Sequence, residues 1–232
     1  EINTSNNVVQ GNYIGTDATG TLNRGNRIGS GVQLQGSSIN KRVGGSAGEG
    51  NLIAYNARNG VDVVNGSGDA IVGNTIYSNT LLGINLGAAG ITLNDLGDAD
   101  AGANNLQNFP ALTSANSNAA GTTMVGSLNS NANTTYRIEF YANRPSISDA
   151  SNGEGEHYLG FVTVTTDGSG NAAINTTLSN VWVNSGDRIT ATATADLGGG
   201  SYGSTSEFAT NVTATSTGII VVDTTSDVSD GT

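Results

Sequence analysis

The chain has no cysteine, two prolines, one histidine and one tryptophan among its 232 residues. The missing cysteine excludes disulfide scaffolds, thiolate metal sites and cysteine nucleophiles. Only 8 basic residues stand against 19 acidic ones, a formal net charge of −11, so neither nucleic acid nor an anionic membrane surface is an expected partner. No apolar run reaches the roughly 18 residues that a spanning helix needs, so we expect no membrane insertion.

The sequence is rich instead in glycine, asparagine, serine and threonine. Glycine alone accounts for 34 residues, and only 12% of residues are charged. This composition argues against helical bundles and coiled coils. The chain opens on Glu1-Ile2-Asn3, without an initiator methionine or a signal peptide, so we expect a processed or excised piece.

Two stretches of the first half repeat each other at an offset of 23 residues. Residues 50–63 and 73–86 share Gly-Asn-x-Ile, followed by a common asparagine and a common glycine. The same opening occurs at residues 11–14, and Gly31-Val32-Gln33-Leu34 is an earlier copy of the second signature. Three copies of two linked signatures indicate a repeat architecture.

Each signature predicts a short strand with alternating side chains, bounded by glycine and asparagine that suit left-handed turns. A 23-residue turn with two or three such strands is typical of one rung of a parallel β-helix, in which equivalent Ile and Val residues stack. Residues 1–93 are therefore predicted to form a short parallel β-helix, with residues 15–29 as an inserted loop.

Residues 94–110 are predicted to form a linker, and longer alternating strands follow it. In residues 134–141, Tyr136, Ile138 and Phe140 share one face and charged residues share the other, which predicts a half-buried antiparallel strand. Further strands are expected at 122–128, 158–166, 172–178, 188–195 and 207–214.

The strand at 188–195 alternates alanine, expected to face inward, with threonine, expected to face solvent. Turn signals separate the strands at the spacing of a β-sandwich. Six or seven strands in residues 111–216 therefore predict an immunoglobulin-like fold.

Several motifs resemble a known class of protein. The stretch from Gly11 to Gly20, and Val43-Gly44-Gly45 followed by Gly50-Asn51-Leu52-Ile53, resemble the right-handed parallel β-helix repeats of very large bacterial surface and secreted proteins. Residues 104–110 and 205–208 resemble the sandwich module that follows those repeats. The resemblance implies an all-β protein, with a short right-handed parallel β-helix followed by an immunoglobulin-like antiparallel β-sandwich, in an extracellular or cell-surface location.

The densest acidic cluster lies in the expected linker. Asp95, Asp98 and Asp100 alternate with glycine and small residues, and Asn104 follows them. Oxygen ligands in this pattern suit calcium, although the EF-hand pattern is not matched because no closing Glu is present. We expect a calcium site that stiffens the junction, and the alternative is a solvated flexible linker.

Two other groups of residues have side chains that could form a site. Glu154-Gly155-Glu156-His157 brings two carboxylates beside the single histidine, but adjacent positions on a Gly-rich hairpin do not converge, so we expect an exposed loop. Trp182 could stack on a sugar, but a lone tryptophan in a sandwich more often packs in the core.

No catalytic centre is expected. Hydrolases built on β-helices need two carboxylates that flank the scissile bond, and the residues aligned with Asp62 are Gln33 and Asn85. A polysaccharide-active enzyme is thus the weaker alternative. A carbohydrate-binding or adhesive module is the stronger one, and it would require an exposed aromatic strip from Trp182, Tyr136, Tyr141, Tyr158 and Tyr202.

The two ends of the chain complement each other. The predicted β-helix begins almost inside a strand, at residues 7–10, without a capping element. Residues 217–232 contain a β-forming segment, Ile219, Ile220, Val221 and Val222, which resembles the opening strand of a further β-helix module.

We therefore expect a non-enzymatic structural module or filament subunit, in which this strand is donated head-to-tail to another copy or to an adjacent module. Alternatively, the segment pairs within its own sandwich as an edge strand.

Overall fold

The computed structural model describes residues 1–36, 39–146 and 151–217, and the predicted assembly strand Ile219–Val222 lies outside them. Within this part of the chain the secondary structure is almost entirely β, which confirms the all-β prediction, and parallel sheets are present. One 3-10 turn is found among these described residues, η1 (Ala103–Leu106), and it lies between the two halves. None of the helical structure in the described ranges is long and apolar enough to cross a membrane.

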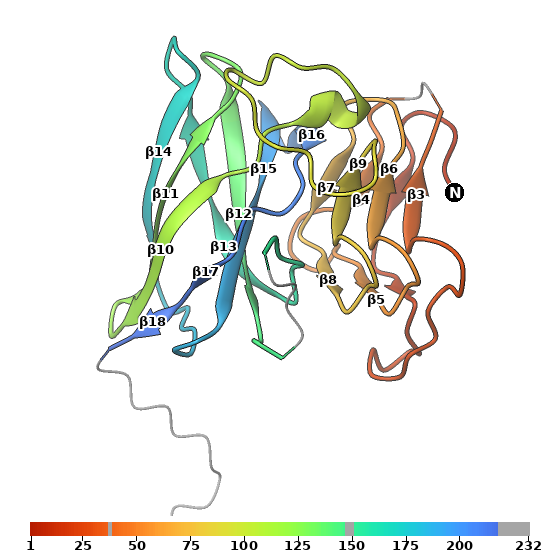
Figure 1. The fold of residues 1–232 in the computed structure, drawn as a ribbon, viewed down its shortest axis with the longest axis horizontal. Coiled ribbons are helices and arrows are strands. Elements are labelled where there is room, and N and C mark those ends of the chain that lie inside the picture. Colours follow the sequence, from red (N-terminus) through yellow and green to blue (C-terminus); the bar gives the residue numbers. More distant parts are fainter. Residues whose placement is uncertain (37–38, 147–150, 218–232) are drawn as a thin grey trace, which may run out of the picture.

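The described residues of the first half form nine short strands in three parallel sheets (Figure 1). We call β1, β2 and β3 the first layer, β4, β5 and β6 the second, and β7, β8 and β9 the third, because each sheet takes one strand from each layer. The strands are β1 (Val8–Val9), β2 (Tyr13–Ile14), β3 (Val32–Leu34), β4 (Arg42–Gly44), β5 (Leu52–Ala54), β6 (Val61–Val63), β7 (Ala70–Val72), β8 (Thr75–Tyr77) and β9 (Ile84–Leu86).

The register of these sheets follows the sequence repeat. Ile53 pairs with Ile76, and Asp62 pairs with Asn85, both at the predicted offset. The strands of the β1-β4-β7 sheet fall outside the two signatures. Strand β1 lies within the strand expected at residues 7–10, whereas β4 and β7 were not individually predicted. Residues 15–31 connect β2 to β3, as expected for an inserted loop.

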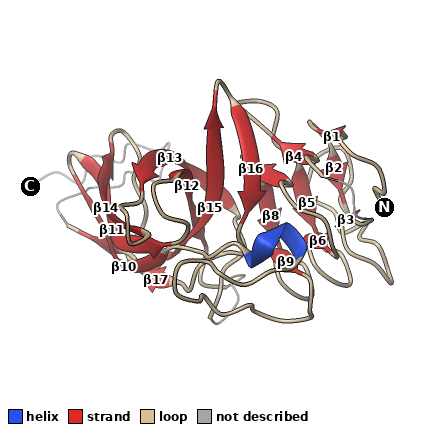
Figure 2. Ribbon diagram, turned by 90° about the horizontal axis from the view of Figure 1, so that it is seen from above, coloured by secondary structure: helices blue, strands red, loops and turns tan. Residues whose placement is uncertain are grey.

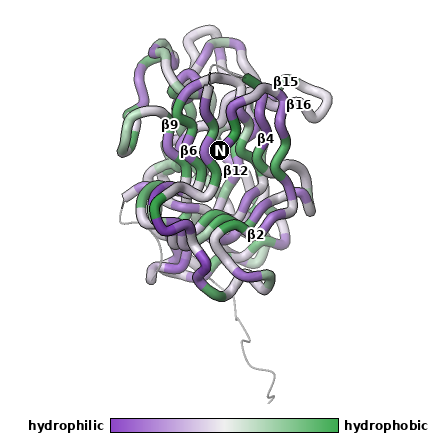
Figure 3. The backbone as a smooth tube through the Cα atoms, turned by 90° about the vertical axis from the view of Figure 1, so that its right-hand side faces the viewer, coloured by the Kyte–Doolittle hydropathy of each residue, from purple (hydrophilic) through white to green (hydrophobic). Residues whose placement is uncertain are grey.

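Aliphatic side chains stack between the three sheets of the first half. Ile53 and Ile76 are fully buried in the second and third layers, whereas Ile14, which continues the same stack, is only partly buried. Likewise Val43 is buried and Val9, its partner in the first layer, is partly buried. The apolar stack is therefore less covered at its N-terminal end, which faces the viewer in Figure 3.

The second half has two sheets. One has the strand order β14-β11-β10-β18 and the other β13-β12-β15-β16, with β17 also paired to β15. Neighbours are antiparallel apart from the parallel pair β10 and β18. The strands are β10 (Ala111–Asn118), β11 (Gly121–Asn129), β12 (Thr135–Asn143), β13 (His157–Thr165), β14 (Asn171–Leu178), β15 (Arg188–Gly198), β16 (Ser201–Thr205), β17 (Val212–Thr213) and β18 (Thr215–Ser216).

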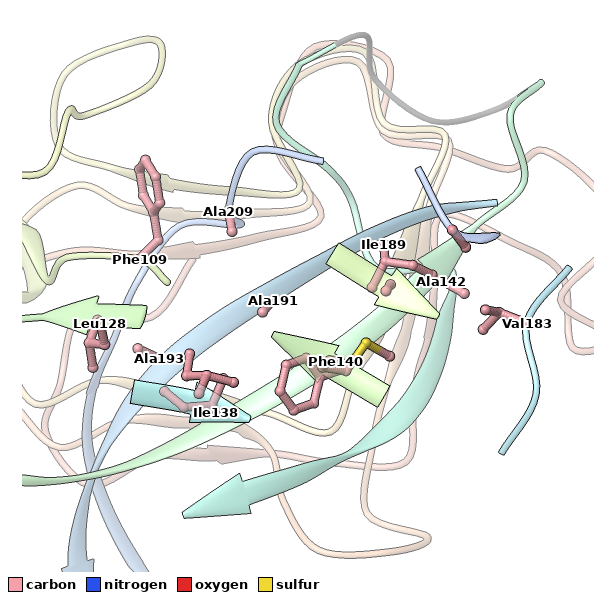
Figure 4. Close-up of a cluster of buried hydrophobic side chains, with 14 of the residues drawn as sticks. Phe109, Leu128, Ile138, Phe140, Ala142, Val183, Ile189, Ala191, Ala193 and Ala209 are labelled. Carbon is pink, nitrogen blue, oxygen red and sulfur yellow. The ribbon is translucent and has the colours of Figure 1, made fainter. Parts of the chain in front are cut away.

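A hydrophobic core joins these two sheets (Figure 4). Met124 and Ile174 come from the first sheet, and Ile138, Phe140 and Ala191 come from the second. Alternation along β12 and β15 directs Ile138, Phe140 and Ala191 inward, as the sequence predicts.

The opposite face of the second sheet differs from expectation. The threonines Thr190, Thr192 and Thr194 were predicted to face solvent and are fully buried, and Glu139 is also buried. The reason is that this face packs against the third layer of the first half (Figure 2). Strand β12 is therefore buried on both faces rather than half-buried.

Two strands were missed and two further sequence predictions are wrong. Strands β10 and β16 were not predicted, and residues 207–210 are not part of a regular strand. Trp182 is 49% exposed instead of buried in the core, and its Nε1–H donates to the backbone oxygen of Asn118 at 3.0 Å.

Candidate functional site

The acidic segment between β9 and η1 folds back on itself. Gly97 and Asp98 adopt φ values of 77° and 56°, which turn the backbone so that alternate carboxylates converge. One carboxylate oxygen from each of Asp95, Asp98 and Asp100 lies within 4.8 Å of the other two. The three oxygens are therefore close enough to share one Ca²⁺, whose oxygen ligands lie about 2.4 Å from the ion.

The second half of the chain fixes the orientation of Asp98. Its Oδ1 accepts the backbone N–H of Asn108 at 2.8 Å, and its Oδ2 accepts from Ser130 Oγ and Asn131 Nδ2, both at 2.9 Å. Asp98 is buried. One member of the acidic group is therefore held rigidly.

Asp100 has a different environment. Its Oδ1 is buried and has no hydrogen-bond partner among the described residues. Burial and the nearby Asp95 carboxylate raise the pKa of Asp100, and burial together with the charges of Asp100 and Asp95 raises the pKa of Asp98. A hard cation would relieve this repulsion and complete the coordination of the orphaned oxygen.

Asn104, the fourth predicted ligand, is engaged elsewhere. Its Nδ2 donates to the backbone oxygens of Asp69 and Thr205 at 2.7 and 2.9 Å, and its Oδ1 accepts the N–H of Asp69 at 2.8 Å. Three of the four predicted ligands thus come together, and Asn104 instead ties η1 to the third layer.

Asparagines link successive layers of the first half. The backbone N–H and the Nδ2 of Asn56 both donate to Asn79 Oδ1, at 3.1 and 2.9 Å. Asn51 makes the same two bonds to Asn74 Oδ1. The side-chain oxygen of each asparagine therefore accepts hydrogen bonds from the layer before it. Its own backbone N–H and Nδ2 need an acceptor from the layer after it.

The second half supplies this acceptor to the third layer. Glu154 Oε1 accepts both the N–H and the Nδ2 of Asn79 at 3.0 Å, which repeats the pattern of an asparagine one layer further on. Beside it, Gly155 exchanges two backbone hydrogen bonds with Ile76, at 2.7 and 2.8 Å. The prediction of an exposed loop is therefore wrong, because Glu154 and Glu156 are both buried.

Other side chains complete the cover of the third layer. Glu139 Oε2 accepts the N–H of Gly73, and Glu207 Oε1 accepts the N–H of Leu86, both at 2.9 Å. Tyr141 and Phe208 pack edge to face and join the aliphatic core of the first half. We call Glu139, Glu154 and Glu207 the capping glutamates. The sequence did not identify them as functional residues.

A buried ion pair and a buried carboxylate lie at the same junction. Lys41 Nζ lies 3.0 Å from Asp69 Oδ2 in an ion pair shielded from solvent, and burial raises the pKa of Asp69 despite this partner. Burial also raises the pKa of Glu207 to about 7, against the hydrogen bonds from Leu86 and Thr92.

The polar row that contains Asp62 lies on the outer face of the β3-β6-β9 sheet. Asp62 Oδ1 accepts from Asn85 Nδ2 at 2.9 Å, in the predicted alignment. A cavity of about 430 Å³ lies here, and among the described residues that line it Asp62 is the only carboxylate, with Arg58 as the only cation. The pair of carboxylates needed for glycoside hydrolysis is not gathered in this cavity.

The aromatic residues proposed for a carbohydrate strip divide into two sets. Tyr136 and Tyr141 are buried, whereas Tyr158 is exposed and Tyr202 is half-buried. Tyr158 and Tyr202 approach Arg137, which also covers the ring of Phe161. Phe161 was not anticipated from the sequence.

Comparison with known proteins does not identify a family for this chain. No family model matches the chain, and no curated protein matches it significantly in sequence.

Proposed function

We propose that the chain is a non-enzymatic structural module of an extracellular bacterial surface protein or filament. In this proposal the first half is a short right-handed parallel β-helix, the second is an immunoglobulin-like β-sandwich, and the function is mechanical. The sequence resemblance and the stacked parallel layers support it.

The observation that carries the proposal is the difference between the two ends of the layered half. The capping glutamates and Gly155 seal the third layer. At the other end, β1 and β2 are the last strands of their sheets among the described residues, and Val8 and Tyr13 are 52% and 54% exposed. Unpaired strand edges with exposed apolar side chains favour the addition of another strand.

The proposed occupant of this open edge is the segment Ile219, Ile220, Val221 and Val222 of a second copy or of an adjacent module. Its aliphatic residues match the Val and Ile chemistry of the exposed layer. Because the donor and acceptor surfaces differ, the contact is heterologous, and in this proposal the rotation between copies does not close a ring, so the contact propagates into a filament.

Calcium is proposed as a stiffening ion at the junction. Asp95, Asp98 and Asp100 would hold it through carboxylate oxygens, and Asp98 is anchored to Asn108 and Ser130 of the second half. The buried, unpartnered Oδ1 of Asp100 supports the proposal, since a lone acidic cluster would otherwise be ordinary in so acidic a chain.

Electron microscopy of the full chain tests the assembly. We expect fibres from the wild-type protein and none from the double variant Ile220→Asp/Val222→Asp, whose charges oppose burial in the open edge. The variant Ser226→Asp, placed beyond the aliphatic run, is the control and should still form fibres. Fibres from the double variant, or particles of single copies from the wild type at all concentrations, would contradict head-to-tail strand donation.

A further inference from the structure

A second cleft lies where the two halves meet, away from the open edge. Its volume is about 930 Å³. Residues 45–48 and Gly73 of the first half form one wall, and the outer strands β13 and β14 of the second half form the other. Arg137, Tyr158, Phe161 and Tyr202 line it.

A β-bulge brings two aromatic rings to the same side of this cleft. Phe140 pairs with Gly160 and Tyr141 pairs with Tyr158, so Leu159 is the extra residue in β13. Leu159 turns inward to the hydrophobic core. Tyr158 and Phe161, which would face opposite ways in a regular strand, are instead both exposed, at 39% and 47%.

Arg137 organises the aromatic wall. Its guanidinium carbon lies 3.5 Å from the centre of the Phe161 ring and 5.6 Å from that of Tyr202. Its Nη2 donates to the hydroxyl of Tyr158 at 2.9 Å, which leaves the hydroxyl proton of this tyrosine available to a ligand. Burial raises the pKa of Tyr158 to about 12, so this proton is retained at neutral pH.

The wall carries no net charge. Arg137 Nε donates to Glu139 Oε1 at 2.8 Å, and this buried ion pair neutralises the guanidinium. The whole chain has a net charge of −11, which opposes the approach of acidic ligands.

We propose that this cleft binds a neutral saccharide. One face of the Phe161 ring lies against Arg137, and the opposite face of this half-exposed ring is available for the C–H groups of a sugar to stack on. The Tyr158 hydroxyl and Thr176 offer hydrogen bonds to sugar hydroxyls. An extended peptide is a poorer occupant, because the bulge interrupts the edge of β13 where a peptide strand would pair.

Saturation-transfer NMR and calorimetry with a panel of neutral gluco-, manno- and galacto-oligosaccharides test the site on the full chain. Oligogalacturonates serve as the acidic comparison. We expect binding of at least one neutral oligosaccharide, and a loss of about tenfold or more in affinity for Phe161→Ala. Thr163→Ala, an exposed position on the same face of β13, should bind as the wild type does.

Three results would overturn the inference: no binding of any neutral oligosaccharide, equal affinity of the wild type and Phe161→Ala, or preference for the acidic sugars. Thermal melting checks that both variants fold. The result is independent of the proposed assembly, because the fibres depend on β1 and β2 and should form unchanged in Phe161→Ala.

Discussion

Glu154 is placed where a fourth layer would place an asparagine. Its Oε1 accepts two hydrogen bonds from Asn79, a buried residue whose Nδ2 also donates to the backbone oxygens of Ile53 and Tyr77 at 3.2 and 3.3 Å. Buried donors left unpaired cost about 1–3 kcal/mol each. A single carboxylate oxygen therefore contributes substantially to the junction.

We predict that Glu154→Ala lowers the free energy of unfolding by about 1–3 kcal/mol, because the N–H of Asn79 loses its acceptor while Nδ2 keeps only its longer bonds to the carbonyls of Ile53 and Tyr77. Glu154→Gln keeps an amide oxygen and should lose less than half as much. Urea denaturation of the two variants measures the difference. Equal losses would show that the acceptor oxygen is not what matters at this position.

Glu207 makes stability depend on pH. Its pKa is raised from an ordinary value of 4.5 to about 7 by burial, so the folded protein holds the proton more tightly than the unfolded chain does. The resulting stability is fully present below pH 4.5 and is lost as the pH rises to about 7.

We predict that Glu207→Gln removes this part of the pH profile, which amounts to up to about 3 kcal/mol between the two pKa values. Denaturation of both proteins at intervals from pH 4 to pH 8 checks it. Parallel profiles for the wild type and the variant would mean that Glu207 ionises normally.

At the scale of the elements, the three layers are not equally protected. Ile14, Ile53 and Ile76 belong to one stack, but only Ile53 and Ile76 are fully buried. We predict that Ile53→Ala costs about 3–4 kcal/mol and that Ile14→Ala costs about half of that, because less of its side chain leaves water on folding. Chemical denaturation measures the free energy of unfolding of both variants. A larger loss of stability for Ile14→Ala than for Ile53→Ala would contradict the weaker burial of the first layer.

The acidic loop gives a prediction that depends on the ion. Asp100→Asn removes a repelling charge without breaking any hydrogen bond described for its Oδ1. Without calcium, this variant should be as stable as the wild type or more so. With calcium, the wild type should gain several degrees in its thermal midpoint and the variant should need at least about tenfold more calcium for the same gain.

Asp196→Asn is the matched control, since it removes one charge and keeps an oxygen for the N–H of Gly198. It should respond to calcium as the wild type does. No calcium response in the wild type, or the same loss of response in both variants, would exclude the proposed site.

The sequence predicts the layered half better than the other. The 23-residue offset places Ile53 beside Ile76 because stacked layers repeat their inward side chains at a fixed period. Strand β10 was missed because Ala111–Asn118 is built mostly of small and polar residues with little alternation. The spacing of Asp95, Asp98 and Asp100 in the sequence predicts that they cluster. It does not predict that Asp100 Oδ1 is buried without a hydrogen-bond partner among the described residues.

At the scale of the whole molecule, what could not be predicted is the packing of one half on the other. The threonines of β15 have the pattern of a solvent-facing row, and only the neighbouring half makes them buried. For the same reason the capping glutamates resemble ordinary surface carboxylates in the sequence. Local alternation specifies which side chains share a face, but not what covers that face.

The capping glutamates seal the third layer, whereas the first layer is less covered among the described residues. In the proposed assembly, a donor segment on one copy and a different acceptor edge on the next give the polarity that a filament subunit or a stalk module requires. The capping glutamates and the proposed calcium ion would keep the junction rigid as load passes from one half to the other.

Sedimentation velocity of the full chain over a range of concentrations tests the open end most directly. We expect the sedimentation coefficient to rise with concentration, and this rise to be abolished both by Val8→Lys/Tyr13→Lys at the exposed edge and by Ile220→Asp/Val222→Asp in the proposed donor. A single species at every concentration, or association that survives both pairs of substitutions, would contradict the account.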